Sequence, residues 1–402
     1  MVRRFLVADA LSLLGNAAAA VILPWLVLVR TGNATAAGTV AAASALPMLL
    51  SAIGGGVLID RFGRRSMSVI ADLGSAMSIA ALPIVDATIG LNLGWFVVLG
   101  VAGALFDVPG LTAREALLPE VARASGTPIE RVAGLREGTA AVVLLVGPGA
   151  GAVLLALTGG PAALWLTAAT SALAALVTSS LRVRNAAPGT GARPARGNWW
   201  AEVAEGWRTL RDDQVLVALT VLVTASAALV GSLLGVLLPV RLAATTGPQW
   251  LGAVITAIAV GSLLGAGLYA ASGARLHRRT WFVAGACVHG AGLVLVAALP
   301  GPPVMLLGAV LAGAGGAPLS SMLTVIVAER VPDVLRGRVL GFQNAVGLGV
   351  APVGMLLAGI AVDRFGVLSV SRLMALAWAA TILVVLALPA LRRLEAVDAH
   401  HR

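Results

Sequence analysis

The chain has 402 residues, of which 59% are hydrophobic and 11% are charged, whereas about 25% of residues are charged in an average soluble domain. A soluble domain of this composition would have too little polar surface to cover its core, so the composition predicts an integral membrane protein. The formal net charge is +10 and all 28 basic residues are arginine, which excludes a P-loop ATPase and Schiff-base chemistry, because both need lysine.

Twelve apolar stretches follow one another, and a transmembrane helix needs about 20 such residues. We expect spans at 5–29, 37–59, 67–86, 92–113, 132–157, 162–181, 215–240, 251–272, 281–299, 303–328, 339–362 and 369–391. The expected fold is therefore all-α, with twelve transmembrane helices in two six-helix bundles at 1–181 and 215–402, the second followed by a short tail. The first stretch lacks an A-x-A-like cleavage site, which favours a retained helix over a signal peptide.

The arginines predict the orientation of these spans. Only Arg30, Arg241, Arg364 and Arg372 fall on the side opposite the N-terminus, which leaves 24 of the 28 on the N-terminal side. Because cytoplasmic loops are rich in arginine, both termini are expected in the cytoplasm of a bacterial cell, with the chain in the inner membrane. The basic excess then reports topology and not nucleic-acid binding. The expected partners are the lipid bilayer and a small-molecule substrate, and the expected state is a monomer.

The loop at 182–214 separates the two bundles. It begins with a stretch rich in Pro and Gly, Ala187–Gly197, and continues as the segment Trp199–Arg211. In this segment Trp200, Val203 and Trp207 recur at helical spacing, which is typical of a helix that lies in the membrane interface. We interpret it as a tether on the inner leaflet.

An internal repeat closes two of the spans. Residues Gly56–Gly63 and Gly359–Gly366 both read Gly-x-x-x-Asp-Arg-Phe-Gly, at the ends of the second and eleventh stretches. The predicted topology places one copy inside and the other outside. Equivalent segments of opposite orientation are a mark of inverted repeats in transporters.

The first copy continues as Arg64-Arg65, so that Gly63 can form a turn and Asp60 can cap the next helix or pair with Arg64. This pattern resembles the signature of the major facilitator superfamily, G-x-x-x-D-R-x-G-R-R/K, which joins the second and third helices (motif A). The resemblance implies a latch that holds the two halves together on the cytoplasmic side in the outward-open state. By this resemblance the latch residues are Gly56, Asp60, Arg61, Gly63 and Arg64. Asp60→Asn is then expected to reduce transport.

The fifth stretch contains Gly147-Pro148-Gly149-Ala150-Gly151. It resembles motif C of the superfamily's drug antiporters, G-P-x-x-G-G, with Ala152 in place of the last glycine. Proline bends a membrane helix and the glycines let another helix approach closely. Other segments, such as Ser12–Asn16 and Glu205–Arg208, resemble the branch with macrolide and siderophore exporters.

Ionisable groups inside a membrane span are costly and mark functional sites. Asp9, Ser12 and Asn16 form one polar face of the first span. We expect Asp9 to carry the coupling proton, with Ser12 and Asn16 as hydrogen-bond partners, although a solvated residue near the helix end is the alternative. The resembling branch often has an acid where Asn16 stands.

Two further acids are candidates for coupling. Asp72 lies within the third span, and its role stays open. Asp107 lies within the fourth span, where pairing with Arg64 or with Arg114 in the latch is favoured over proton transfer. The Arg-Gln-Gly signature of drug antiporters is absent from this span, and Arg114 is expected near its cytoplasmic end.

The second half has no acid deep within a span. Thr224, Gln343 and Asn344, together with Ser12 of the first half, are the candidates to line a substrate cavity. A cavity so poor in fixed charge suits a bulky, largely apolar substrate.

The sequence as a whole predicts a secondary active transporter that exports hydrophobic or amphiphilic small molecules, of the multidrug efflux type, by proton antiport with alternating access. A dedicated exporter of a siderophore or another secondary metabolite is the alternative within transport, and a membrane sensor is the alternative from another class. No nucleophile–base pair and no Cys/His metal cluster is evident, so we expect neither an enzyme nor a metal site, and no cofactor besides the proton gradient as energy source.

Overall fold

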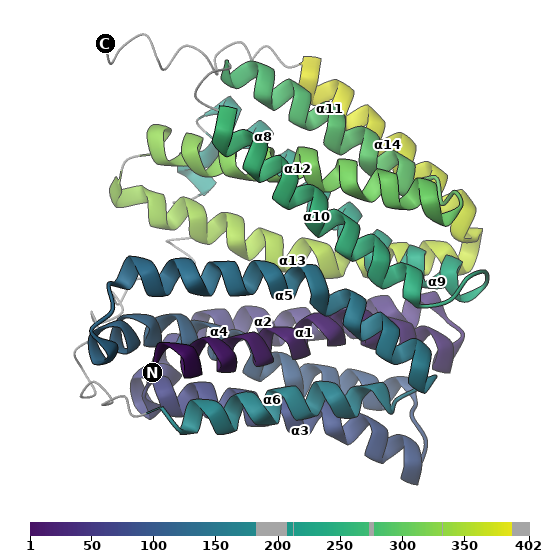
Figure 1. Cartoon of the computed structure of the whole chain (residues 1–402). Helices are drawn as coiled ribbons and strands as arrows, with labels where there is room; N and C mark the ends of the chain where they lie inside the picture. The colour runs from purple at the N-terminus through teal and green to yellow at the C-terminus, as the bar shows by residue number, and fades with distance from the viewer. Residues whose placement is uncertain (182–206, 212, 273–276, 332, 388–402) are drawn as a thin grey trace. The chain divides into compact units, whose positions relative to one another are not determined.

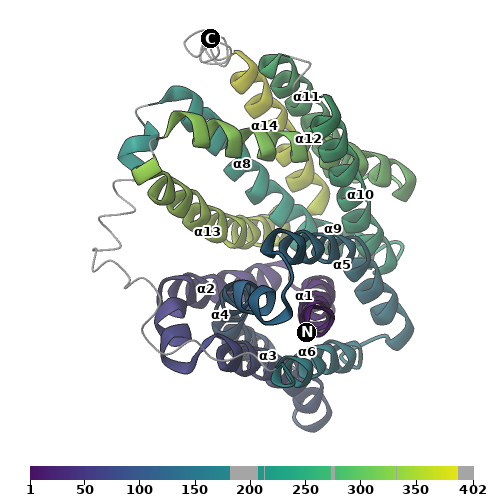
Figure 2. The same ribbon diagram turned by 60° about the vertical axis from the view of Figure 1, so that its left-hand side comes forward.

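The computed structural model describes residues 1–181, 207–211, 213–272, 277–331 and 333–387, and this described part contains no β-strand. The chain divides into two compact units, which are treated separately (Figures 1 and 2). The first comprises Met1–Ala195 and Leu242–Gly252, and the second comprises Arg196–Arg241 and Ala253–Arg402. Most of the predicted tether, including Trp200 and Val203, and the end of the C-terminal tail lie outside the described residues.

Six long helices form the first unit. They are α1 (Val2–Thr31), α2 (Ala34–Phe62), α3 (Arg64–Thr88), α4 (Leu93–Ser125), α5 (Ile129–Thr158) and α6 (Ala163–Ser179). Helix α1 packs along α5 and α6, α3 packs along α4 and α6, and α2 packs along α4. The helix starts follow the sequence, because the side chains of Asn33 and Asn92 accept backbone N–H groups of the first turns of α2 and α4.

The second unit has the same number of spans. Its elements are α8 (Gln214–Ser232), the π-helical turn η1 (Leu233–Leu237), α9 (Leu238–Ala243), α10 (Gln249–Ser272), α11 (Arg278–Ala297), α12 (Pro302–Arg330), α13 (Asp333–Phe365) and α14 (Val367–Ala387). The end of α9 and the start of α10 fall within Leu242–Gly252 and so belong to the first unit. Helices α8, η1 and α9 form one continuous span. Helix α11 packs against α12 and α14, while α8 packs against α13.

Asp213 caps the first helix of the second unit. Its Oδ1 accepts the Val215 N–H at 2.8 Å, and its Oδ2 accepts a hydrogen bond from Arg330 at 2.8 Å. Partial burial opposes ionisation of this carboxyl, but the two contacts outweigh it and lower the pKa of Asp213 below its usual value.

The helices have the length and surface of membrane spans. In the described residues, eleven are long and apolar enough to cross a bilayer. Helix α6 has 17 residues, which corresponds to about 26 Å and the lower end of the spanning range. Large apolar side chains such as Leu157, Leu176 and Leu383 are 80%, 64% and 68% exposed, as expected for side chains that face lipid. The predicted fold of twelve transmembrane helices is confirmed.

The two copies of the repeated motif have the same backbone turn. Helices α2 and α13 end at Phe62 and Phe365, and the next residues, Gly63 and Gly366, have φ of 80° and 79°. The N–H of each glycine bonds to the carbonyl four residues earlier, at 2.8 Å in both turns. A side chain would strain this conformation, so the motif needs glycine at its last position.

Candidate functional site

The first unit contains four buried charged side chains that lie together. Asp9 of α1 is 0% exposed, Asp72 of α3 is 4%, Arg114 of α4 is 3% and Arg136 of α5 is 8% exposed. We call these four residues the charged cluster. Each comes from a different helix, so the cluster links four of the six helices of the unit.

Two ion pairs organise the charged cluster. Arg114 pairs through Nη2 with Oδ2 of Asp72, and the Ser12 hydroxyl donates to Oδ1 of Asp72 at 3.0 Å. The Nε of Arg136 lies 3.2 Å from Oδ2 of Asp9, and the Nε of Arg114 lies 3.9 Å from Oδ1 of Asp9. Two carboxylates therefore balance two guanidinium groups, which remain charged at any physiological pH.

The two acids differ in how well they are bonded. Both oxygens of Asp72 accept hydrogen bonds, from Ser12 and Arg114. Neither oxygen of Asp9 accepts a hydrogen bond from a described residue, although both are buried. Asp9 is therefore held by ion pairs, the nearest from Nε of Arg136 at 3.2 Å, and not by well-directed hydrogen bonds like those of Asp72.

The structure excludes the alternative of a solvated Asp9 and corrects its predicted hydrogen-bond partners. Asp9 is buried and is not a solvated helix end, because the N-terminal turn of α1 packs against α4 and α5. Ser12 lies on the same face of α1, as predicted, but it donates to Asp72 and not to Asp9. Asn16 lines a small cavity together with Asp72.

That cavity also contains Asp107. Its volume is about 10 Å³, which is the size needed for a single water molecule, and Ser75 and Asp107 are among its lining residues. The predicted pairing of Asp107 with Arg64 or Arg114 was wrong, because these arginines bind Glu120 and Asp72 instead. Asp107 therefore stands apart from the latch arginines.

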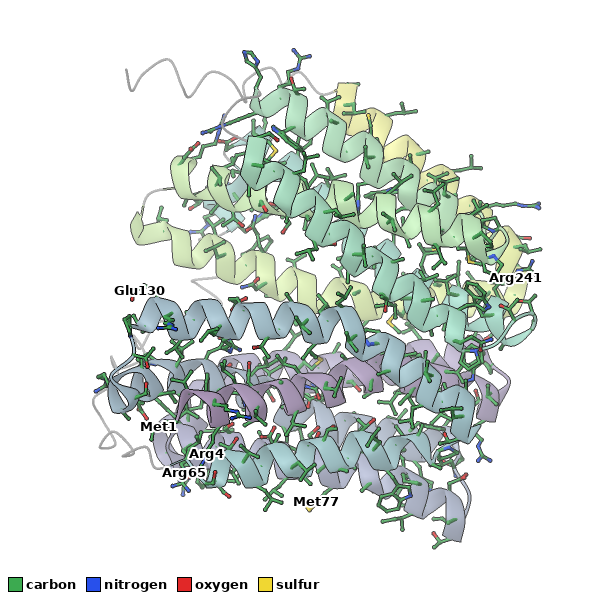
Figure 3. The ribbon with its side chains drawn as sticks, viewed as in Figure 1. Met1, Arg4, Arg65, Met77, Glu130 and Arg241 are labelled. Carbon is green, nitrogen blue, oxygen red and sulfur yellow. The ribbon has the colours of Figure 1, made fainter. Side chains whose placement is uncertain are left out.

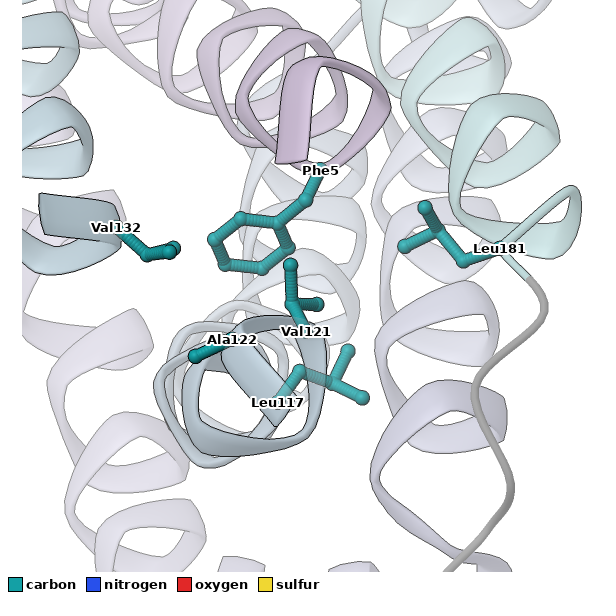
Figure 4. Close-up of a cluster of buried hydrophobic side chains, with 6 residues drawn as sticks. All are labelled: Phe5, Leu117, Val121, Ala122, Val132 and Leu181. Atoms are coloured by element: carbon teal, nitrogen blue, oxygen red, sulfur yellow. The ribbon is translucent and has the colours of Figure 1, made fainter. Parts of the chain in front are cut away.

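An apolar layer lies one helical turn from the charged cluster. Phe5 of α1, Leu117 and Val121 of α4, Val132 of α5 and Leu181 are each at most 1% exposed (Figure 4). Figure 4 shows the Phe5 ring pointing toward the α4 residues, with Val132 on one side and Leu181 on the other. On α1 and α5 the layer precedes the cluster residues along the chain, and on α4 it follows them, so the layer separates the cluster from one end of the bundle.

That end carries the start of the chain. Met1, Arg4, Arg65 and Glu130 all lie there in Figure 3, and we call it the Met1 end. The second arginine of the motif A pair, Arg65, donates to the carbonyl of Ser179 at the end of α6. The motif A turn thereby binds the first unit's helices at the same end that the apolar layer closes.

The motif A residues contribute one buried contact here. The guanidinium of Arg64 donates to Glu120 of α4 at 2.8 Å, and the Glu120 side chain is 5% exposed. Arg61 lies over the Phe62 ring, 5.9 Å from its centre. Gly56 and the side chain of Asp60 lie outside the described part, and the α3 N-terminus has no side-chain cap from a described residue.

The motif C glycines bring α5 against α1. A Cβ at Gly147 would lie 2.7 Å from Cβ of Ala17, and a Cβ at Gly151 would lie 2.8 Å from Cα of Ala18. Pro148 is buried between them. These positions therefore need glycine because the two helices approach too closely for any side chain.

A groove lies between α1 and α5 on the surface of the unit. Its volume is about 610 Å³ and it runs toward the Met1 end. Ala10 and Leu135, the sequence neighbours of Asp9 and Arg136, line it together with Arg3 and Arg131. None of the predicted site residues lines this groove.

The second unit has a buried histidine that the sequence analysis did not select. His289 of α11 is 8% exposed, and its Nδ1 lies 2.6 Å from the Ala312 carbonyl of α12. Because a carbonyl can only accept, Nδ1 carries the proton, and the Ser226 hydroxyl of α8 then donates to Nε2 at 2.7 Å. Trp378 of α14 packs edge-on against the ring. His289 thus joins four helices without an acidic partner in the described residues.

The predicted cavity residues of the second unit are distributed differently. Gln343 of α13 donates to the Thr220 hydroxyl of α8 at 2.8 Å, whereas Asn344 is exposed and Thr224 is half-buried. Trp207, the described end of the predicted tether, has its ring 5.5 Å from that of Phe342. The three candidates do not share one described site.

The sequence matches a known family over nearly its full length. The profile of the Major Facilitator Superfamily matches residues 5–241 and again 220–401. The chain belongs to the major facilitator superfamily. Two curated relatives are the multidrug efflux pumps Tap of Mycobacterium tuberculosis and of Mycolicibacterium fortuitum, each 32% identical. The first alignment covers 97% of this chain and 94% of the relative, and the second covers 95% and 94%.

Solved structures of other superfamily transporters share the fold. The nucleoside transporter NupG has a TM-score of 0.72 at 13% identity, and the match covers 96% of this chain and 98% of that one. A bacterial homologue of the iron transporter ferroportin in an inward-facing state has a TM-score of 0.68 at 14% identity, covering 96% and 98%. At these identities the likeness establishes the superfamily fold alone. The protein is a multi-pass bacterial membrane protein.

Proposed function

We propose that the chain is a secondary active transporter that exports hydrophobic or amphiphilic small molecules in exchange for protons, with Asp9 as the proton-carrying group. The observation that carries this proposal is the charged cluster, in which Asp9 is fully buried and accepts no hydrogen bond from a described residue. Ionisable residues buried inside a membrane protein are costly, and proton relays are one of the few functions that retain them.

Protonation of Asp9 would change the charge balance of four helices at once. With both acids ionised, the charged cluster is neutral, since Asp9 and Asp72 balance Arg114 and Arg136. A proton on Asp9 removes the closest counter-charge of Arg136 and leaves it the exposed carboxylates of Glu115 and Glu137, at 3.7 and 3.6 Å. Such a change favours a different arrangement of the helices, which is what couples a proton to a conformational equilibrium.

The substrate class rests on two supports. The relatives that align over the full chain bear the name multidrug efflux pump. The polar candidates of the second unit, Gln343 and Thr224, are uncharged, which suits a bulky apolar substrate better than a sugar or an amino acid. Both favour broad export over a dedicated siderophore exporter.

The remaining assignments follow the same proposal. The protein would act as a monomer in the bacterial inner membrane with both termini in the cytoplasm, as the distribution of arginines predicts. It would transport its substrate chemically unchanged, without enzymatic activity, nucleic-acid binding or a cofactor.

Transport of ethidium, a lipophilic cation, by purified protein in proteoliposomes tests the proposal. An imposed pH gradient should drive ethidium uphill, and an uncoupler should abolish that movement. Asp9→Asn should lose uphill transport and keep downhill exchange. Asp86→Asn is the matched control, because Asp86 pairs with Arg30 on the exposed surface of the same unit at 2.7 Å.

Two results would contradict the proposal. Uphill ethidium transport by Asp9→Asn at wild-type rates would remove Asp9 from the coupling. Binding of ethidium by the wild-type protein without any accumulation would favour a membrane sensor over a transporter.

A further inference from the structure

Arg136 is the cluster residue that contacts both the buried acid and the surface. Its Nε lies 3.2 Å from Asp9, its Nη2 lies 3.7 Å from Glu115 of α4, and its Nη1 lies 3.6 Å from Glu137 of α5. Asp9 is 0% exposed, whereas the side chains of Glu115 and Glu137 are 61% and 75% exposed. One guanidinium thus has three carboxylates within reach, one buried and two exposed.

We infer that Arg136 is the positioning residue that controls protonation of Asp9, by moving its guanidinium between Asp9 and the exposed carboxylates of Glu115 and Glu137. This inference rests on the proposed function, because it concerns how the proposed proton carrier exchanges its proton. Neither the family resemblance nor the sequence patterns assigned a role to Arg136.

Charge balance gives the reason for the movement. When Asp9 is ionised, its negative charge is the closest counter-charge to Arg136. When a proton from water binds a carboxylate oxygen of Asp9, Arg136 keeps its own charge and loses that counter-ion. Glu115 and Glu137 are the replacement partners, and a small rotation of the side chain brings either within hydrogen-bond distance. Release of the proton to water reverses the step.

No other charged group among the described residues around Asp9 can change its ion-pair partner in the way proposed for Arg136. Arg114 is already bonded to Asp72 of α3, and both are buried. Helix α6 contains no ionisable residue. Among the described side chains of α2, the ionisable one is Arg61, which lies over Phe62.

The surroundings of Asp9 also favour proton exchange with water on the side of Arg136. Toward the Met1 end, Phe5, Leu117 and Val132 are at most 1% exposed and separate Asp9 from water. On the side of Arg136, the groove between α1 and α5 brings the surface to Leu135 and Ala10, one residue from each member of the pair. In this inference, Asp9 exchanges its proton with water on the side of Arg136 and not through the apolar layer.

The pH dependence of ethidium binding to the purified full-length protein tests this inference. If protons and ethidium compete through Asp9, binding is half lost at a defined pH in the wild-type protein. Arg136→Gln removes a positive charge beside Asp9, so this midpoint should rise by about one pH unit. The double variant Glu115→Gln/Glu137→Gln removes the alternative partners of Arg136, so the midpoint should fall. Arg123→Gln, on the exposed surface near the end of α4 and outside the groove, is the matched control and should leave the midpoint unchanged.

Opposite shifts would support the inference when the two glutamine substitutions shift the midpoint less in the Arg136→Gln background than in the wild type, because a direct effect of Glu115 and Glu137 on Asp9 would not need Arg136. Shifts in the same direction, an equal shift in both backgrounds, or no shift in the double glutamine variant, would overturn it. If Arg136→Gln does not fold, no shift in the double glutamine variant would still overturn the inference. The proposed function fails separately, if Asp9→Asn retains pH-dependent ethidium binding and uphill transport.

Discussion

Substituting Asp72 and Arg114 together should destabilise the protein less than substituting either residue alone. Each side chain is at most 4% exposed, and each is the other's closest charged partner. Arg114→Gln leaves a buried carboxylate without a cation, and Asp72→Asn leaves a buried guanidinium whose next carboxylate is Asp9, 3.9 Å away. Breaking a buried ion pair in this way costs about 3–5 kcal/mol of unfolding free energy.

The double variant Asp72→Asn/Arg114→Gln removes both charges and keeps polar side chains of similar size. Replacement of a whole buried pair is often close to neutral, so the double variant should lose less unfolding free energy than either single variant. The double-mutant cycle formed by the wild type, the two single variants and the double variant should give a coupling free energy of about 3 kcal/mol or more. Denaturant titration of the four proteins in detergent micelles measures it.

Transport by the same double variant tells the two acids apart. Asp9 and Arg136 remain, so the double variant should still drive ethidium uphill in proteoliposomes. Two results would refute the reasoning: a double variant as unstable as the worse single variant, or a stable double variant that has lost uphill transport. The second result would assign the proton-carrying role to Asp72 in place of Asp9.

Two further predictions concern helix packing and motif A. Gly147→Ala should lower the unfolding free energy by about 1–2 kcal/mol, because its Cβ would lie 2.7 Å from that of Ala17, and Ala17→Gly should restore part of the loss in denaturant titrations. Gly138→Ala, where no atom lies within 4 Å, should stabilise slightly, and a loss as large as that of Gly147→Ala would contradict the packing argument. Arg64→Gln should lower the unfolding free energy by about 2–3 kcal/mol, because Glu120 is left buried without its cation. An unfolding free energy equal to that of the wild type would show the contact to be unimportant.

The fold could be predicted from the sequence because lipid allows few solutions. A span must satisfy its backbone internally, so length and hydropathy suffice to place a helix. The predicted ends of the spans were less accurate where a helix continues into charged residues. The fourth span was expected to end at 113, but α4 continues to Ser125, because Leu117 and Val121 extend its buried face past Arg114.

The early end of the fourth span hid Arg114, whereas Arg136 lay inside the expected fifth span at 132–157. Arg114 and Arg136 were counted among the arginines of the cytoplasmic side, since a hydropathy count treats a charge near a span end as a loop residue. A signal was nevertheless present, because Val132 and Arg136 are four residues apart on one helical face, as are Ala113 and Leu117 beside Arg114. The partners of these arginines depend on how α1, α3, α4 and α5 pack, which no single-helix pattern contains.

The repeated motif shows how two similar halves come to hold different chemistry. Both copies end in a glycine with φ close to 80°, so the repeat encodes the same turn in each unit. The first copy continues with Arg64, which binds the buried Glu120, whereas the second continues with Val367, which has no charge to offer. The buried charges follow the same division. The first unit balances two acids against two arginines, while His289 in the second unit bonds to a hydroxyl and a carbonyl and needs no counter-ion. Burying a balanced set of charges is costly, and the proposed antiport needs one such set to respond to one proton, so neutral polar groups in the second unit are compatible with it.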